Sequence, residues 1–227
     1  MCSFDPNLLR EFYVMSRFDP DWGGALKKGV LIVLEGIDGA GKSTQARFLL
    51  RMLRREGWNA VYFREPSRGK WGREIKRKAK EAASLRPEEE LDLFLKDRQE
   101  NVRKNLRPAL KEKKVVVLDR YYFSTIAYQG AKGIDRARIM RLNEDFAPKP
   151  DLVFILDIEA KDGLARIEGR KKKDKLFERA AYLAKVRRIF RSFKGGRFHH
   201  IDAGLDRNEI SKLILEKTLK YLKKAES

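Results

Sequence analysis

The stretch VLIVLEGIDGAGKST, from Val30 to Thr44, decides the fold of this chain. It begins with an almost continuously apolar run, which is typical of a β-strand covered on both faces of a parallel sheet. The residues that follow satisfy the pattern G-x-x-x-x-G-K-[ST] through Gly36, Gly41, Lys42 and Ser43. A strand before these glycines and a helix after them are the context of a phosphate-binding loop, so we predict a P-loop here.

The predicted P-loop has the residue types that grip a triphosphate. Glycines allow successive backbone N–H groups to turn toward an anion, and the following helix adds its N-terminal partial positive charge. Lys42 can reach the β- and γ-phosphates, and the Ser43 hydroxyl can bind Mg²⁺. We therefore expect ATP and Mg²⁺ as ligands. The predicted ATP contacts are Gly36, Ile37, Asp38, Gly39, Ala40, Gly41, Lys42, Ser43 and Thr44.

Further short apolar runs alternate with helical patterns along the chain. The runs are Ala60–Phe63, Lys114–Asp119, Asp151–Ile158 and Arg197–Asp202. After the P-loop, Ala46, Leu49, Leu50 and Leu53 recur at helical spacing, and a last helix is expected to bury Ile210, Leu213, Ile214, Leu219 and Leu222. This alternation predicts an α/β chain with the three-layer P-loop NTPase fold, in which helices flank a five-stranded parallel sheet.

Asp119 stands at the end of the third predicted strand. Ligands of such sheets bind at the carboxyl ends of the strands, so this carboxylate should lie near the P-loop. There it can hold Mg²⁺ directly or through water, together with Ser43. We predict Ser43 and Asp119 as the metal site.

Composition narrows the class of protein. The 227 residues suit one domain, and no apolar run approaches the roughly 20 residues of a membrane helix. The first residues lack the pattern of a secretory signal, so we expect a cytoplasmic protein. The net charge is +19, but 52 Lys and Arg are interleaved with 33 Asp and Glu along the whole chain. This favours solvated helix faces, and we do not expect a dedicated nucleic-acid surface.

The stretch DRYYFSTIAYQG, Asp119 to Gly130, resembles the thymidylate kinase signature D-R-[YH]-x-x-S-x-x-A-[YF]-Q. Three other segments fit this family in chain order: LEGIDGAGKST (34–44), FREP (63–66) and LFLKDR (93–98). The resemblance runs from about residue 30 to 205. It implies an enzyme that phosphorylates dTMP to dTDP with ATP by direct in-line transfer, and a homodimer.

The resemblance also implies roles for individual residues. Arg120 would lie between the donor and acceptor phosphates, where a guanidinium binds phosphate oxygens bidentately. Phe94 would stack on the thymine ring, and Arg98 would bind its O4. Asp38 matches a family carboxylate near the sugar 3′-hydroxyl and the metal-bound phosphates. Thr125, Tyr128 and Gln129 would line the base and deoxyribose pocket, with the tyrosine under the sugar.

Two departures from the family pattern affect the predicted arginines. Many relatives have Gly-Gly-Thr after REP, whereas this chain has SRGKWG, so Arg68 either contacts the acceptor phosphate or points into solvent. One branch of the family carries a catalytic arginine in the P-loop, where this chain has Ala40. The other branch uses a mobile lid, which we place at about residues 160–178. Arg166 and Arg170 are the candidates to close over the ATP phosphates.

Several boundaries and alternatives stay open on the sequence alone. We expect an N-terminal extension of unknown role over residues 1–28 and a thymidylate-kinase-like domain over residues 29–227. A kinase of broader monophosphate specificity is the first alternative. A nucleic-acid-dependent P-loop ATPase is the second, and it would need a polymer-binding module that the sequence does not reveal.

Overall fold

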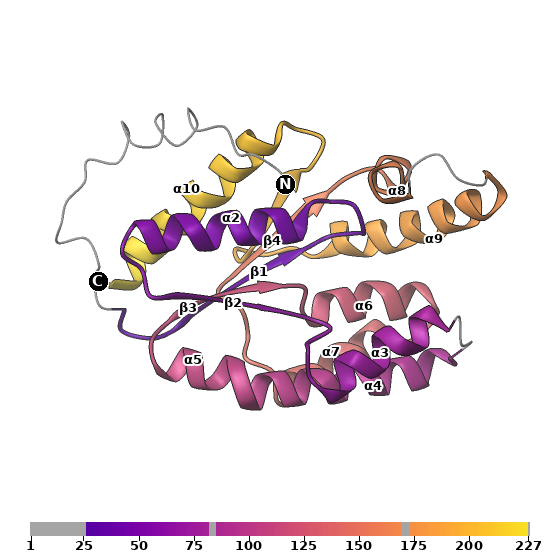
Figure 1. Cartoon of the computed structure of the whole chain (residues 1–227), viewed down its shortest axis with the longest axis horizontal. Helices are drawn as coiled ribbons and strands as arrows, with labels where there is room; N and C mark the ends of the chain where they lie inside the picture. The colour runs from indigo at the N-terminus through magenta and orange to yellow at the C-terminus, as the bar shows by residue number, and fades with distance from the viewer. Residues whose placement is uncertain (1–25, 82–84, 169–172, 227) are drawn as a thin grey trace.

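The computed structural model describes residues 26–81, 85–168 and 173–226, which form a sheet between two helical layers (Figure 1). The strands are β1 (Val30–Glu35), β2 (Ala60–Arg64), β3 (Val115–Asp119), β4 (Leu152–Asp157) and β5 (Phe198–Asp202). All pairings are parallel, in the order β2-β3-β1-β4-β5. The predicted strands and fold class are therefore confirmed.

The register of the central strands brings the predicted site residues to one edge. Leu34 of β1 pairs with Asp119 of β3, and Glu35 pairs with Ile155 of β4. Residues of β1 and β3 are buried throughout, as expected for strands covered on both faces. Because parallel strands end at the same edge, the P-loop after β1 lies beside the segment after β3.

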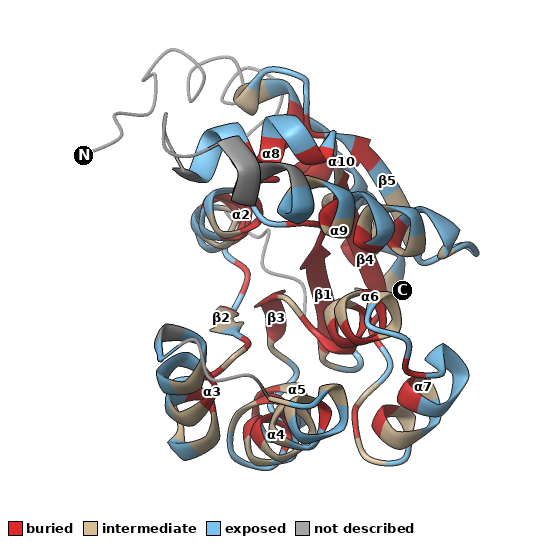
Figure 2. Cartoon of the chain, turned by 90° about the vertical axis from the view of Figure 1, so that its right-hand side faces the viewer, coloured by how far each residue is buried: buried red, intermediate tan, exposed pale blue. Residues whose placement is uncertain are grey.

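Helices cover both faces of the sheet. They are α2 (Lys42–Arg55), α3 (Lys70–Lys80), α4 (Pro87–Asn101), α5 (Arg107–Lys111), α6 (Tyr122–Ala131), α7 (Arg136–Glu144), α8 (Ala160–Glu168), α9 (Lys173–Ser192) and α10 (Arg207–Glu226), and the π-helical turn η1 (Val102–Leu106) joins α4 to α5. In Figure 1, α2 and α10 lie on one side of the sheet and α4 to α7 on the other. Figure 2 shows the buried strands between them.

The buried faces of α2 and α10 follow helical periodicity, with Leu50 and Leu219 half-buried against the core and one predicted residue exposed. Ala46, Leu49 and Leu53 of α2 are buried, as predicted. The prediction for Leu213 of α10 was wrong, because its exposed fraction is 36%. The buried stripe of α10 follows the i, i+4 rows that include Ile210, Ser211, Ile214, Leu215, Thr218 and Leu222. Leu213 lies about 100° round the helix from Ile214, on the side away from this stripe.

The described chain begins inside the predicted N-terminal extension. Leu26 is buried in the hydrophobic core, and Lys28 pairs with Asp151 at 3.0 Å. Residues 1–25 lie outside the described part, so the division at residue 28 stays a prediction.

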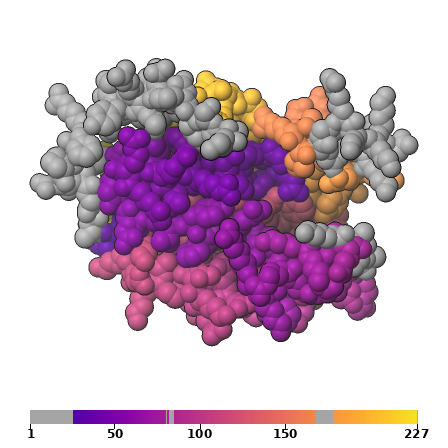
Figure 3. All heavy atoms as spheres, in the orientation of Figure 1, coloured from indigo at the N-terminus to yellow at the C-terminus, as the bar shows by residue number. Residues whose placement is uncertain are grey.

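In the space-filling view the segment with α2 lies between α10 above and α5 below (Figure 3). No described helix is long and apolar enough to cross a membrane.

Candidate active site

The P-loop has the backbone geometry that its glycines predict. Gly36, Gly39 and Gly41 all have positive φ values, of 136°, 82° and 91°. At Gly39 a Cβ would also lie 2.0 Å from the carbonyl oxygen of Gly163 in α8, so a side chain is sterically excluded there. The loop therefore packs closely against α8 and begins α2 with left-handed Gly41 at its N-cap.

Lys42 is buried beneath the P-loop. Its Nζ donates to the carbonyl oxygen of Ile37 at 2.6 Å, so the side chain folds back against the loop that precedes it. Burial lowers the pKa of Lys42 to about 7, and the charge of Arg120 acts in the same direction. A bound triphosphate would supply the negative charge that favours the ammonium form.

The predicted metal residues lie together at the sheet edge. The Ser43 hydroxyl donates to Asp119 Oδ2 at 2.5 Å, and the Tyr62 hydroxyl donates to the same oxygen at 3.0 Å. A hydroxyl beside a buried carboxylate is a set of hard oxygen ligands, which fits Mg²⁺. The described residues contain no group of three or more His, Cys, Asp or Glu that could hold a metal. Phosphate oxygens and water would have to complete its coordination.

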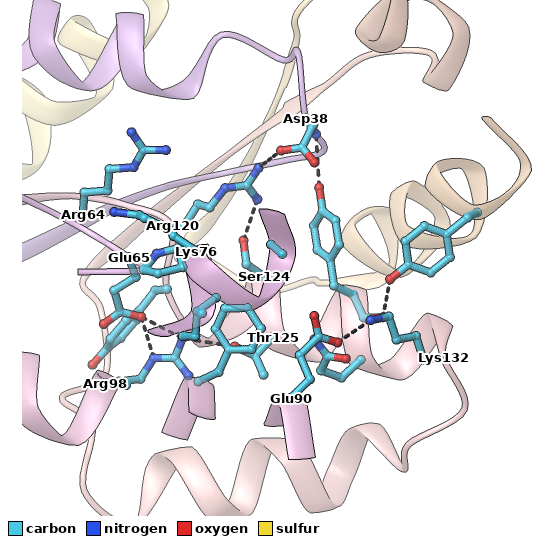
Figure 4. A pocket seen from close by; sticks show the side chains of 18 residues that line it. Asp38, Arg64, Glu65, Lys76, Glu90, Arg98, Arg120, Ser124, Thr125 and Lys132 are labelled. Carbon is cyan, nitrogen blue, oxygen red and sulfur yellow. Dashed lines mark hydrogen bonds and ion pairs between the residues drawn. The ribbon is translucent and has the colours of Figure 1, made fainter. Parts of the chain in front are cut away.

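A pocket of about 320 Å³ opens next to the P-loop and is lined by residues of α3, α4, α6 and α9 (Figure 4). Of the residues predicted for dTMP binding, all except Arg68 line it: Asp38, Phe94, Arg98, Arg120, Thr125, Tyr128 and Gln129. These residues come from three separate stretches of the sequence. The fold therefore assembles one concave site from them.

Arg98 is held rigidly at the edge of this pocket, with an exposed fraction of 1%. Its Nε donates to Glu65 Oε2 at 2.8 Å, and its two terminal nitrogens donate to Asn143 Oδ1 at 2.5 Å and Thr125 Oγ1 at 3.1 Å. Burial raises the pKa of Glu65, and the charge of Arg98 opposes that rise. A buried guanidinium fixed by three partners offers a directed donor edge instead of a mobile charge.

Gln129 brings an unsatisfied acceptor to the same pocket. Its Oε1 is buried and has no hydrogen-bond partner among the described residues. Such a group costs free energy unless a ligand supplies a donor. Phe94 lies one helical turn before Arg98 on α4 and is half-buried at the pocket. The pocket thus combines an aromatic face, a donor edge and an open acceptor.

Arg120 lies where the P-loop meets the pocket, as Figure 4 shows. One terminal nitrogen pairs with Asp38, and the other donates to Gly36 O at 3.3 Å and to Ser124 Oγ at 3.1 Å. Its guanidinium also lies over the Tyr128 ring, 5.4 Å from the centroid. Partial burial acts to raise the pKa of Asp38, but the charges of Arg120 and Lys42 outweigh it and lower that pKa.

Other cationic residues line the pocket where the sequence predicted Arg68. Arg68 is exposed, and within the described part of the chain its one hydrogen bond is made by its backbone oxygen, which accepts from Arg73 at 2.9 Å. Arg64 at the end of β2 and Lys76 on α3 line the pocket instead. Arg64 belongs to the FREP segment (63–66), and its position directly after a predicted strand could have indicated a site residue from the sequence. Nothing in the local sequence distinguished Lys76 from its neighbouring lysines.

The predicted lid arginines are only partly described. Arg166 on α8 donates to the carbonyl oxygen of Ala203, after β5, at 3.1 Å. Arg170 lies outside the described residues, and the role of both stays a prediction. Arg179 on α9 was not predicted, although its charge contributes to lowering the pKa of Asp38. It follows the stretch KDKLFE, just beyond the predicted end of the lid.

Comparisons with known proteins agree with this geometry. The sequence model described as thymidylate kinase matches residues 34–214, which is most of the chain. The chain belongs to the thymidylate kinase family. It is 45% identical over 188 residues to the thymidylate kinase of Brachyspira hyodysenteriae, covering 83% of this chain and 92% of that protein. It is 48% identical over 161 residues to the probable thymidylate kinase of Archaeoglobus fulgidus, covering 71% and 80%. As a member of this family the chain is a phosphotransferase.

Proposed function

We propose that this thymidylate kinase transfers the γ-phosphoryl group of ATP directly to the phosphate of dTMP, giving ADP and dTDP. The observation that supports this best is the position of Arg120, which pairs with Asp38 of the P-loop and also lines the adjacent pocket. A nucleotide phosphate beside Arg120 in the pocket would face the γ-phosphate of a nucleotide held by the P-loop. Two bound phosphates at that junction would be positioned for in-line transfer.

The acceptor needs no general base. A phosphate monoester is already ionised near neutral pH, so the site has to hold two anionic groups together and neutralise them. Arg120 and Lys42 carry positive charge from the two sides of the junction, and Arg64 and Lys76 line the acceptor side. Arg68 and the lid residues Arg166 and Arg170 would add further phosphate contacts after closure.

Mg²⁺ and ATP are part of this proposal. Ser43 and Asp119 would hold the metal, and bound Mg²⁺ would neutralise phosphate oxygens of the donor. The P-loop residues 36–44 would wrap the triphosphate with their backbone N–H groups. Lys42 would leave the Ile37 carbonyl oxygen and reach the phosphates instead.

The lining of the pocket fits a thymine base. Phe94 would stack on the ring, and Arg98 with Thr125 would offer donors to a carbonyl oxygen of the base. The unpartnered Gln129 Oε1 would accept from the ring N–H of thymine. Cytosine has an acceptor at the matching ring nitrogen and would leave two acceptors facing each other. Tyr128 would lie under the deoxyribose and restrict a 2′-hydroxyl.

The wider setting is proposed from the family and the composition. We place the enzyme in the cytoplasm, acting as a homodimer in dTTP biosynthesis, without a nucleic-acid partner. Its small-molecule partners are ATP and dTMP.

The deciding experiment measures ADP release with Mg²⁺-ATP against dTMP, dUMP, dCMP, dGMP, UMP, CMP and AMP, with thymidine as a control. We expect a strong preference for dTMP and no turnover with thymidine, which lacks the ionised acceptor. Comparable rates with several monophosphates would support the broader-specificity alternative. Turnover that needs DNA or RNA and no monophosphate would overturn the proposal.

A further inference from the structure

Glu35 is a wholly buried carboxylate for which the proposed chemistry has no direct use. It is the last residue of β1, and its exposed fraction is 0%. Its Oε1 accepts from the backbone N–H of Tyr121 at 2.8 Å and of Ser124 at 3.1 Å. A carboxyl group buried this deeply is tolerated only where such donors compensate its lost hydration.

These contacts make Glu35 the cap of α6. Tyr121 is the N-cap residue of that helix, and its own side chain makes no capping hydrogen bond. The first N–H groups of a helix lack the usual i−4 carbonyl partners. Glu35 of β1 accepts from two of them, although the Ser124 N–H also donates to the Tyr121 carbonyl oxygen at 3.0 Å. The carboxylate therefore fixes the start of α6, immediately after Arg120.

Arg120 needs such support because its backbone is strained. Its φ is 70°, in the left-handed region that side-chain-bearing residues rarely adopt. The Arg120 N–H donates to Leu34 O at 3.0 Å, and the next N–H donates to Glu35. Two successive N–H groups, those of Arg120 and the residue after it, therefore donate to the last two residues of β1.

Ser124 extends the link from Glu35 to the guanidinium. Its hydroxyl donates to Glu35 Oε2 at 2.5 Å and accepts from an Arg120 terminal nitrogen at 3.1 Å. The serine has a single hydroxyl proton, which it donates in the hydrogen bond to Glu35. Its lone pairs are therefore left free to accept from the arginine.

We propose that Glu35 and Ser124 are positioning residues that aim Arg120 at the phosphoryl group in transit. This inference rests on the proposed function and adds a role for two residues that need not touch the transferred group. Glu35 sets the start of α6 and the direction of the Ser124 hydroxyl, and the hydroxyl holds the guanidinium between the P-loop and the acceptor pocket.

The test is a set of kinetic cycles with Ser124→Ala, Glu35→Gln and Arg120→Ala. Ser124→Ala removes both hydroxyl contacts and leaves the backbone cap by Glu35 intact, so it serves even if Glu35→Gln fails to fold. We expect kcat to fall about 10- to 100-fold with little change in the KM for ATP, since a hydrogen bond to a charged group is lost. In the Arg120→Ala background, Ser124→Ala should cost almost nothing further.

Ser211→Ala is the matched control. Ser211 is also buried, and its hydroxyl donates to Gln45 Oε1 at 2.8 Å on the other side of the sheet. It should lower thermal stability without changing kcat. Wild-type kcat in Ser124→Ala would overturn the proposal, as would an equal loss in both backgrounds. All rates use whichever monophosphate the wild type phosphorylates, so failure with dTMP would count against the proposed function alone.

Discussion

The guanidinium of Arg120 forms an ion pair with the carboxylate of Asp38, which joins the segment after β3 to the P-loop after β1. The pairing follows from the sheet, because Leu34 and Asp119 are register partners just before these two segments. A cation at this junction can contact phosphates held from either side. It also neutralises Asp38 while no nucleotide is bound.

Arg120→Ala should therefore depress catalysis more than binding. Removing one fixed donor from a developing anion typically lowers kcat by about 10²- to 10³-fold. The KM for ATP should change little, because Lys42 and the loop N–H groups still hold the triphosphate. Steady-state kinetics with both substrates varied would measure the two effects separately. Arg188→Ala, at an exposed position of α9, is the charge-matched control and should retain wild-type rates.

Much of this architecture could be predicted because it depends on local patterns. The run of apolar residues in β1 needed no tertiary information, since a strand buried on both faces has no polar side. The P-loop depends on glycines with positive φ, which only a few residue types tolerate. Phe94 and Arg98 could be paired because a helix brings residues four apart to one face.

The features of the site that the sequence did not predict depend on contacts between residues far apart in the chain. Asn143 lies 45 residues beyond Arg98 yet fixes its guanidinium. Glu35 was part of the quoted strand, but nothing local indicated that it would cap α6. Lys76 could not be ranked as a pocket residue, because which face of α3 meets α4 is decided by packing. Arg68 precedes α3, so its exposure depends on the path of the chain between β2 and α3.

Phe94→Ala should weaken dTMP binding with little effect on ATP. Loss of an aromatic face that stacks on a base costs about 1–3 kcal/mol, which corresponds to a rise of roughly 5- to 150-fold in the dissociation constant. Isothermal titration with dTMP and with Mg²⁺-ATP would provide the comparison within one variant. An unchanged affinity for dTMP would show that the base binds elsewhere.

Gln129→Met should separate stability from recognition. The buried Oε1 has no partner in the nucleotide-free protein, so an apolar side chain of similar length should leave the melting temperature unchanged or raise it. The same change removes the acceptor proposed for the thymine N–H, so dTMP affinity should fall about tenfold. Thermal unfolding with and without dTMP would show both effects. A large loss of stability without dTMP would mean that Gln129 supports the fold.

Burial of both Glu35 and Lys42 should give the nucleotide-free enzyme a minimum of stability near neutral pH. Burial raises the pKa of Glu35 from 4.5 to about 7, so between these values the folded chain keeps a proton that the unfolded chain has released. The stability that Glu35 contributes is full below about pH 4.5 and is lost as the pH rises to about 7. Burial lowers the pKa of Lys42 from 10.5 to about 7, so its contribution is lost as the pH falls across that range.

Glu35→Gln should remove the part of the pH dependence that Glu35 causes, which is the loss of stability between about pH 4.5 and 7. The difference in unfolding free energy between wild type and variant should shrink by up to roughly 3 kcal/mol between pH 4.5 and 8, at 1.36 kcal/mol for each pKa unit. Urea unfolding of the nucleotide-free proteins at a series of pH values would measure it, with Ser211→Ala as a control that keeps the wild-type slope. A difference that stayed constant over this range would mean that Glu35 is ionised throughout, held so by its three hydrogen bonds and Arg120.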